Sequence, residues 1–165
     1  MGKKSILIFG AGKIGRSFIG QLFGLSGYEV VFSDIDKELV DLLNLKRSYC
    51  VVIKGEKEEK LLIPNVRAIN GSEEQAVIEE VCRASIMAIA VGKNALGKII
   101  PNIAKGLVKR FQYHRNSPLD IIIAENMRSA NEYLSGASKK IFRRVFQFIL
   151  MWDWLKRALA KWYRS

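Results

Sequence analysis

The chain alternates between short apolar runs and longer segments in which apolar residues recur every three or four positions. A run of four to six apolar residues is typical of a strand buried on both faces of a parallel sheet. Recurrence every three or four positions is typical of a helix that covers such a sheet. The runs predict strands at 5–9, 28–33, 66–69, 85–91 and 119–124.

Helices are predicted between these strands. Ile14, Phe18, Leu22 and Phe23 give the first helix an apolar side, and Gly27 ends it. The other helices are expected over 36–47, from Ser72-Glu-Glu-Gln75 (capping-box spacing) through Val81, from about Ala95 with an interruption or restart at Pro101, and near Ala130. Residues 49–53 and 61–63, joined by the charged turn 54–60, predict an inserted hairpin. This alternation predicts an α/β fold with a mostly parallel sheet.

Composition indicates a globular protein, because 49% of the residues are hydrophobic and 26% are charged. The net charge of +11 is unevenly distributed. Residues 1–136 hold 19 basic against 15 acidic side chains, whereas 137–165 hold 8 against 1 and all three tryptophans. The strong charge therefore belongs to the tail, which weakens an interpretation of the whole domain as a nucleic-acid binder.

Several classes of site and compartment are not expected. Cys50 and Cys82 are too few for a disulfide framework and are interpreted as reduced packing residues. With one histidine, His114, no zinc site is expected. No signal peptide and no membrane-spanning run is recognised, so we expect a cytoplasmic protein without a membrane or nucleic-acid partner.

The strongest motif is Gly10-Ala-Gly-Lys-Ile-Gly15, which lies between an apolar strand and a helix. In a Rossmann-type doubly wound fold the first glycine allows a tight turn, the second lets a pyrophosphate approach, and the third lets the helix pack on the strand. Asp34 ends the second strand, where a carboxylate accepts ribose hydroxyls and repels a 2′-phosphate. The predicted cofactor is NAD, and the predicted binding residues are Gly10, Ala11, Gly12, Lys13, Ile14, Gly15, Asp34 and Gly92.

Two further strand ends carry candidate residues. Gly92 follows the fourth strand and Glu125-Asn126 follows the fifth, and ligands of open α/β sheets bind at such ends. By spacing alone, Asn126 suits two roles equally well: an amide donor to a substrate oxygen or a cap for the next helix. His114 and the helical cations Lys105, Lys109 and Arg110 are interpreted as solvated.

Four segments together resemble the N-terminal domain of the polyol-specific long-chain dehydrogenases, and within them the mannitol-1-phosphate 5-dehydrogenases. The resemblance covers about residues 4–136, and its segments are Ile8–Gly20, Ala90–Gly92, Ile103–Arg110 and Ser117–Met127. It implies metal-independent, NAD-dependent interconversion of mannitol 1-phosphate and fructose 6-phosphate, with Asn126 helping to hold the substrate oxygen. Another polyol or a hexuronate is the alternative substrate, and a non-catalytic dinucleotide-binding module is the alternative function.

The resemblance ends before the catalytic half of the family. The acid/base lysine that the family uses lies in a helical C-terminal domain, and nothing in 137–165 matches that domain. We therefore expect the chain by itself to bind NAD without turnover. The last strand of a six-stranded nucleotide fold is also expected to be missing, and the exposed sheet edge would then favour self-association.

The tail, residues 137–165, interleaves aromatic and basic side chains without a clean apolar stripe. It suits a basic amphipathic helix for a membrane surface or nucleic acid, a replacement for the missing domain, or an out-of-frame translation. The out-of-frame translation is favoured. Met and Trp have single codons, so a shifted frame over Met151-Trp-Asp-Trp154 must encode Val-Gly-Leu. Permitted codons extend this sequence into one that resembles the start of the family's second half. The frame would be lost between about Gly136 and Lys140.

Overall fold

The computed structural model describes residues 4–54, 58–113, 119–124 and 148–149. In this part of the chain, six strands form one sheet in the order β5-β2-β1-β6-β7-β8, and every neighbouring pair is parallel. The predicted doubly wound, mostly parallel sheet is therefore confirmed. The strands are β1 (Ser5–Phe9), β2 (Glu29–Asp34), β5 (Val66–Asn70), β6 (Ile86–Ile89), β7 (Asp120–Ile123) and β8 (Phe148–Ile149).

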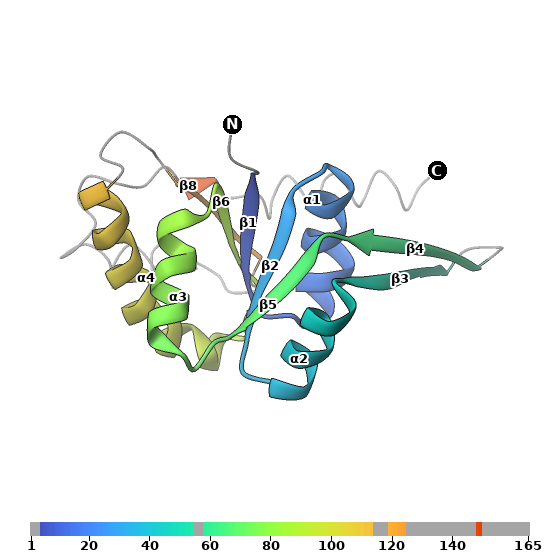
Figure 1. Ribbon diagram of the computed structural model, residues 1–165, viewed down its shortest axis with the longest axis horizontal. Helices are drawn as coiled ribbons and strands as arrows, with labels where there is room; N and C mark the ends of the chain where they lie inside the picture. Colours follow the sequence, from blue (N-terminus) through green and yellow to red (C-terminus); the bar gives the residue numbers. More distant parts are fainter. Residues whose placement is uncertain (1–3, 55–57, 114–118, 125–147, 150–165) are drawn as a thin grey trace.

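Helices cover both faces of the sheet, with α3 and α4 on one face and α1 and α2 on the other (Figure 1). Leu7 and Phe9 of β1 belong to the core beneath α3 and α4, whereas Ile6 and Ile8 belong to the core on the opposite face. Burial on both faces explains why β1 is apolar at nearly every position. The helical elements are the π-helical turn η1 (Gly15–Gly20), α1 (Gln21–Leu25), α2 (Lys37–Lys46), α3 (Glu74–Arg83) and α4 (Lys93–Tyr113).

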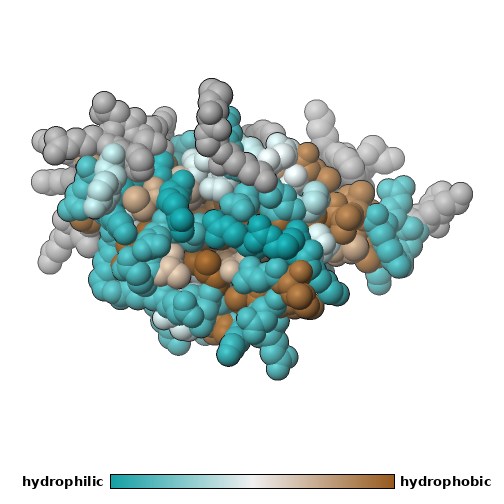
Figure 2. Space-filling view, viewed as in Figure 1, coloured by the Kyte–Doolittle hydropathy of each residue, from teal (hydrophilic) through white to brown (hydrophobic). Residues whose placement is uncertain are grey.

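The predicted hairpin is present as β3 (Ser48–Lys54) and β4 (Glu58–Pro64), an antiparallel pair separate from the main sheet. It projects from the side of the domain that carries α1 and α2 (Figure 1). Its inner face is buried at Val51 and Ile63, while Cys50 and Leu62 on the outer face are exposed. Figure 2 accordingly shows apolar residues on the surface at the right, where the hairpin projects from the domain. The expectation that Cys50 is a packing residue was wrong, because strand alternation turns it outward.

The apolar side predicted for the first helix is only partly correct: Phe18 and Phe23 pack partly buried against the core, whereas Ile14 and Leu22 do not. Ile14 and Leu22 are 43% and 46% exposed, and the helix is buried at Ile19 and at three glycines, Gly15, Gly20 and Gly24. The glycines have no side chain to hold the backbone away from the sheet, so the helix approaches on that side. Apolar periodicity gives no weight to glycine, so it placed the exposed Ile14 and Leu22 on the buried side and missed the buried glycines.

The other predicted helices differ at their ends and interruptions. The cap predicted at Ser72 is wrong, because α3 has Glu73 as its N-cap and the side chain of Asn70 accepts the Ser72 N–H at 2.9 Å. The interruption expected at Pro101 is also wrong, because α4 continues through it. Because Pro101 has no N–H, the carbonyl of Gly97 lacks its usual helical donor. Both residues are exposed, so water can donate a hydrogen bond to that carbonyl.

The three cations of α4 that were expected to be solvated, Lys105, Lys109 and Arg110, have different environments. Lys105 and Lys109 are paired with glutamates of α3 at 2.8 and 3.9 Å, near the surface as expected. Arg110 is only 5% exposed, and its Nη1 donates to the carbonyls of Cys82 and Ala84, both at 2.8 Å. The expectation of a solvated Arg110 was therefore wrong. Its guanidinium satisfies carbonyls left without helical partners at the end of α3.

Beyond β7, the expectation of a missing sixth strand was wrong. Phe148 and Ile149 form β8, which pairs in parallel with Ile121 and Ile122 of β7. This apolar pair lies within the basic, aromatic tail and was not recognised there as a strand. Other residues of 137–165 lie outside the described part, so the three interpretations of the tail stay predictions, as does self-association.

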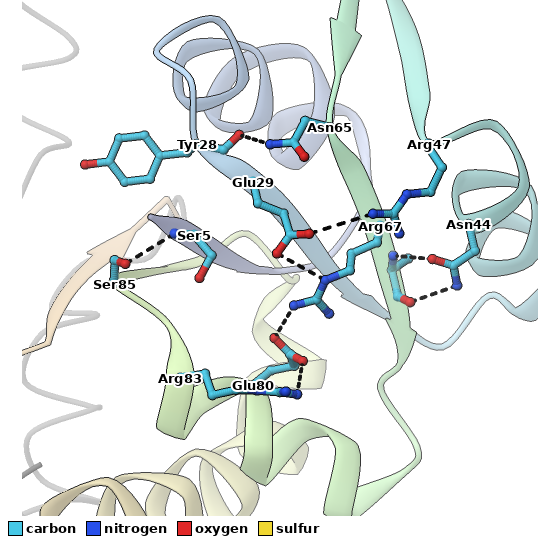
Figure 3. Close-up of polar contacts among 11 residues, drawn as sticks. Ser5, Tyr28, Glu29, Asn44, Arg47, Asn65, Arg67, Glu80, Arg83 and Ser85 are labelled. Carbon is cyan, nitrogen blue, oxygen red and sulfur yellow. Dashed lines mark hydrogen bonds and ion pairs between the residues drawn. The ribbon is translucent and has the colours of Figure 1, made fainter. Parts of the chain in front are cut away.

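A network of charged side chains links β2, β5 and α3 at the edge of the sheet where the strands begin (Figure 3). Arg67 of β5 lies 3.3 Å from Glu29, the first residue of β2, and donates to Glu80 of α3 at 2.7 Å. Glu80 also pairs with Arg83 and is 3% exposed. Because Glu29 begins its strand, this network lies away from the carboxyl ends and supports the fold rather than the candidate site.

Candidate functional site

The carboxyl ends of the central strands meet at one edge of the sheet. Hydrogen bonds continue the ladder past the strands: the Gly10 N–H donates to Ser33 O at 2.9 Å, and the Ala90 N–H donates to Phe9 O at 2.8 Å. The chain runs from β1 outward to β2 and β5, then returns to β6 on the other side of β1. The ends of β1 and β6 therefore form the switch point at which ligands of open α/β sheets bind.

The three glycines of the turn have three different environments. Gly10 has a φ of +93°, and a Cβ there would lie 2.7 Å from Ala90 O. A Cβ on Gly15 would lie 2.0 Å from Gly10 O. A Cβ on Gly12 would meet no atom within 4 Å. Gly10 and Gly15 are thus required by contacts within the protein, whereas the open space at Gly12 fits a close approach by a ligand from outside.

Asp34 joins the end of β2 to the glycine turn. Its Oδ2 accepts the N–H of Ala11 at 2.6 Å, and its Oδ1 accepts the N–H of Asp36 at 3.0 Å. A carboxylate has about four lone-pair positions, so each oxygen can accept a further hydrogen bond from a ligand hydroxyl. The side chain therefore fixes the turn and also leaves acceptors at the edge where the site lies.

The structure places the remaining predicted cofactor residues around this turn. Ala11 is buried, while Lys13 and Ile14 are exposed in the helical turn that precedes η1. Gly92 follows β6 and is exposed, and its carbonyl accepts the Ala95 N–H at 2.8 Å near the start of α4. All eight predicted cofactor residues thus lie at the ends of β1, β2 and β6 or in the adjoining turns. Asn126 and His114 lie outside the described residues.

Tyr49, which was not among the predicted site residues, contacts this region. The hydroxyl of Tyr49, on β3, donates to the Arg16 carbonyl at 2.7 Å. Burial raises the pKa of the Tyr49 phenol, with a smaller opposing effect from Arg16. The two residues are 33 positions apart, and no local pattern connects a hairpin residue to the helix after the glycine turn.

The described part of the chain shows neither a group of metal ligands nor a membrane-spanning helix. No three His, Cys, Asp or Glu side chains among those residues are grouped in a way that could hold a metal ion. None of its helices combines the length and apolar character needed to cross a membrane.

Known proteins match the chain at the level of both sequence and fold. A family model described as the mannitol dehydrogenase Rossmann domain matches residues 4–161. Mannitol-1-phosphate 5-dehydrogenases from Geobacillus stearothermophilus and Brevibacillus brevis are 43% and 42% identical over 150 and 154 residues, which are 86% and 93% of this chain. The chain spans only 39% and 37% of the lengths of these relatives.

Among solved structures, a UDP-glucose dehydrogenase from the archaeon Pyrobaculum islandicum has a similar fold, with a TM-score of 0.60 and 14% identity. The likeness covers 89% of this chain and 34% of that one. The family match continues past Gly136, where the resemblance recognised in the sequence ended.

Proposed function

Because the chain belongs to the mannitol dehydrogenase family, whose Rossmann domain it matches, we propose that it binds NAD at the carboxyl ends of β1, β2 and β6. The observation that carries the proposal is the contrast among the three glycines. Two are required by backbone contacts inside the protein, while Gly12 faces open space. A cofactor pyrophosphate needs a position where backbone can be approached closely, and the helix that follows offers N–H groups to it.

Asp34 would select NAD over NADP. Its carboxylate lies at the end of β2 and retains lone pairs beyond those used by Ala11 and Asp36. These can accept the hydroxyls of the adenosine ribose, whereas a 2′-phosphate would bring two negative groups together. Asp34→Asn is therefore expected to narrow the difference between the dissociation constants for NAD and NADP.

The proposed reaction of the complete enzyme is the interconversion of mannitol 1-phosphate and fructose 6-phosphate, so the small-molecule partner is a polyol phosphate. Bound NAD would supply the acceptor for the hydride. Asn126 is proposed to donate its amide N–H to the substrate oxygen. The acid/base lysine implied by the family resemblance belongs to a second domain, and no lysine of this chain is assigned that role. We also propose a cytoplasmic location, which the two free thiols fit.

Binding and turnover are tested separately with the 165-residue chain. NADH fluorescence is expected to change saturably on addition of protein, and Gly12→Ala should weaken this binding by at least about tenfold. Mannitol 1-phosphate with NAD is expected to give no increase in absorbance at 340 nm. Formation of NADH by the purified chain would refute the proposal that catalysis needs the lysine of a second domain. An absence of NADH binding would refute the proposed function.

A further inference from the structure

The helix after the glycine turn does not begin as a regular α-helix. Residues 13–14 are α-helical, Gly15–Gly20 form the π-helical turn η1, and the helix returns to α form in α1. A π-helical turn is wider than an α-turn and is rare, because it shifts carbonyls away from their usual partners. Such turns are often found where a helix contributes to a functional site.

The inserted hairpin supplies a hydrogen bond to this turn. The Tyr49 hydroxyl donates to Arg16 O at 2.7 Å, and the Arg16 N–H in turn donates to Gly12 O at 3.0 Å. A single residue of η1 is thus held on one side by β3 and on the other by the second glycine of the turn. Movement of Tyr49 would therefore be transmitted to the backbone around Gly12 through one residue.

Glycine is what allows the hairpin to come this close. A Cβ on Gly20 would lie 2.5 Å from the Tyr49 hydroxyl oxygen, and a Cβ on Gly24 would lie 2.5 Å from Cγ2 of Ile63 on β4. The Tyr49 ring is further fixed by an edge-to-face contact with Phe32 at a centroid distance of 5.9 Å. The two strands of the hairpin therefore contact the first helix at two successive glycine positions.

We propose that Tyr49 is a positioning residue for the cofactor turn, through which the β3–β4 hairpin holds η1 in its wide form and fixes the backbone at Gly12. This role rests on the proposed NAD binding. The hairpin is then a brace for the phosphate-binding turn. Loss of the hydroxyl removes this donor from the Arg16 carbonyl in a partly buried place, so the turn would relax toward α-helical register.

Tyr49→Phe tests the brace, and Tyr28→Phe is a matched control. Tyr28 also makes an edge-to-face contact with a phenylalanine, Phe23, at 5.2 Å. In Figure 3 its hydroxyl points away from the labelled residues, and the only hydrogen bond drawn to Tyr28 is to its backbone carbonyl, from Asn65. Each substitution removes one hydroxyl from a tyrosine that packs beside the first helix.

Two measurements are made on both variants and the wild-type chain: the dissociation constant for NAD by calorimetry, and amide hydrogen exchange across residues 12–25. For Tyr49→Phe we expect NAD binding to weaken by about three- to tenfold and exchange to accelerate in 12–25 while β5 and β6 stay protected. Tyr28→Phe should leave both quantities unchanged.

The outcomes separate the brace from the proposed function. If the wild type binds NAD and Tyr49→Phe binds it equally well, the positioning role of Tyr49 is refuted, while the proposal that the chain binds NAD is supported. If Tyr49→Phe weakens binding but exchange accelerates across the whole sheet, the residue is merely structural and the brace is again refuted. If the wild type does not bind NAD, the proposed function fails and the positioning role fails with it.

Discussion

Alanine at Gly12 is expected to separate ligand binding from folding. A Cβ there meets nothing within 4 Å, and the φ of Gly12 lies outside the left-handed region. An alanine at such a position stabilises by about 0.4–1 kcal/mol, because it restricts the unfolded chain. For a domain of this size that raises Tm by about 1–4 °C. The same methyl group stands where a pyrophosphate would approach, so NAD affinity should fall by at least about tenfold, or about 1.4 kcal/mol.

Gly15→Ala is the matched comparison, because it adds the same methyl group three residues away. Its Cβ would lie 2.0 Å from Gly10 O, so the helix must move away from β1. Forcing a methyl group into such a contact destabilises by about 1–3 kcal/mol or more, which lowers Tm by about 2–12 °C. Thermal unfolding followed by circular dichroism, and NAD titration by calorimetry, are run on both variants and the wild type.

Either of two results would contradict this prediction. If Gly12→Ala unfolds at as low a temperature as Gly15→Ala, the space around Gly12 is not open. If Gly12→Ala is fully stable and binds NAD as tightly as the wild type, the ligand does not approach this glycine.

Three further predictions concern stability. Glu80→Gln should destabilise by about 1.5–3 kcal/mol in urea unfolding, because it removes the buried carboxylate that accepts a hydrogen bond from Arg67, while Arg67 keeps Glu29; the exposed Glu74→Gln should change stability by less than about 1 kcal/mol, and equal losses would contradict the network's role. Arg110→Met removes the two hydrogen bonds to the end of α3 and should destabilise by about 2–4 kcal/mol; an unchanged midpoint would show that water replaces the guanidinium. Burial raises the pKa of Tyr49 above its ordinary 10.0, so the contribution of its neutral phenol to the free energy of unfolding is complete below pH 10 and is lost as pH rises further. Between pH 10 and 11 the free energy of unfolding of the wild type should fall by up to about 1.4 kcal/mol more than that of Tyr49→Phe. Parallel dependence of the two unfolding free energies on pH would contradict this.

Much of the architecture could be predicted because it depends on local patterns. The wholly apolar 5–9 run is buried on both faces, and the glycine turn follows it as expected. Asp34 lies beside that turn because parallel strands in register bring their carboxyl ends together. These features follow from neighbouring residues and from the geometry of a parallel sheet.

The features that the sequence did not predict depend on contacts between residues far apart in the chain. The buried side of the first helix is set by glycines that pack on β1 and the hairpin, which an apolar periodicity does not register. Arg110 has the same sequence surroundings as the lysines near it, and only the position of the end of α3 shows that it is buried. Tyr49 belongs to the same class, because its partner Arg16 lies 33 residues earlier.

Binding of NAD at the glycine turn is tested most directly by calorimetric titration of the wild-type chain with NAD and, in parallel, with NADP. We predict saturable binding of NAD at one site per chain, with NADP at least about tenfold weaker because Asp34 repels the 2′-phosphate. Absence of saturation with either nucleotide would contradict the claim of a cofactor site, and equal affinities would contradict the role given to Asp34.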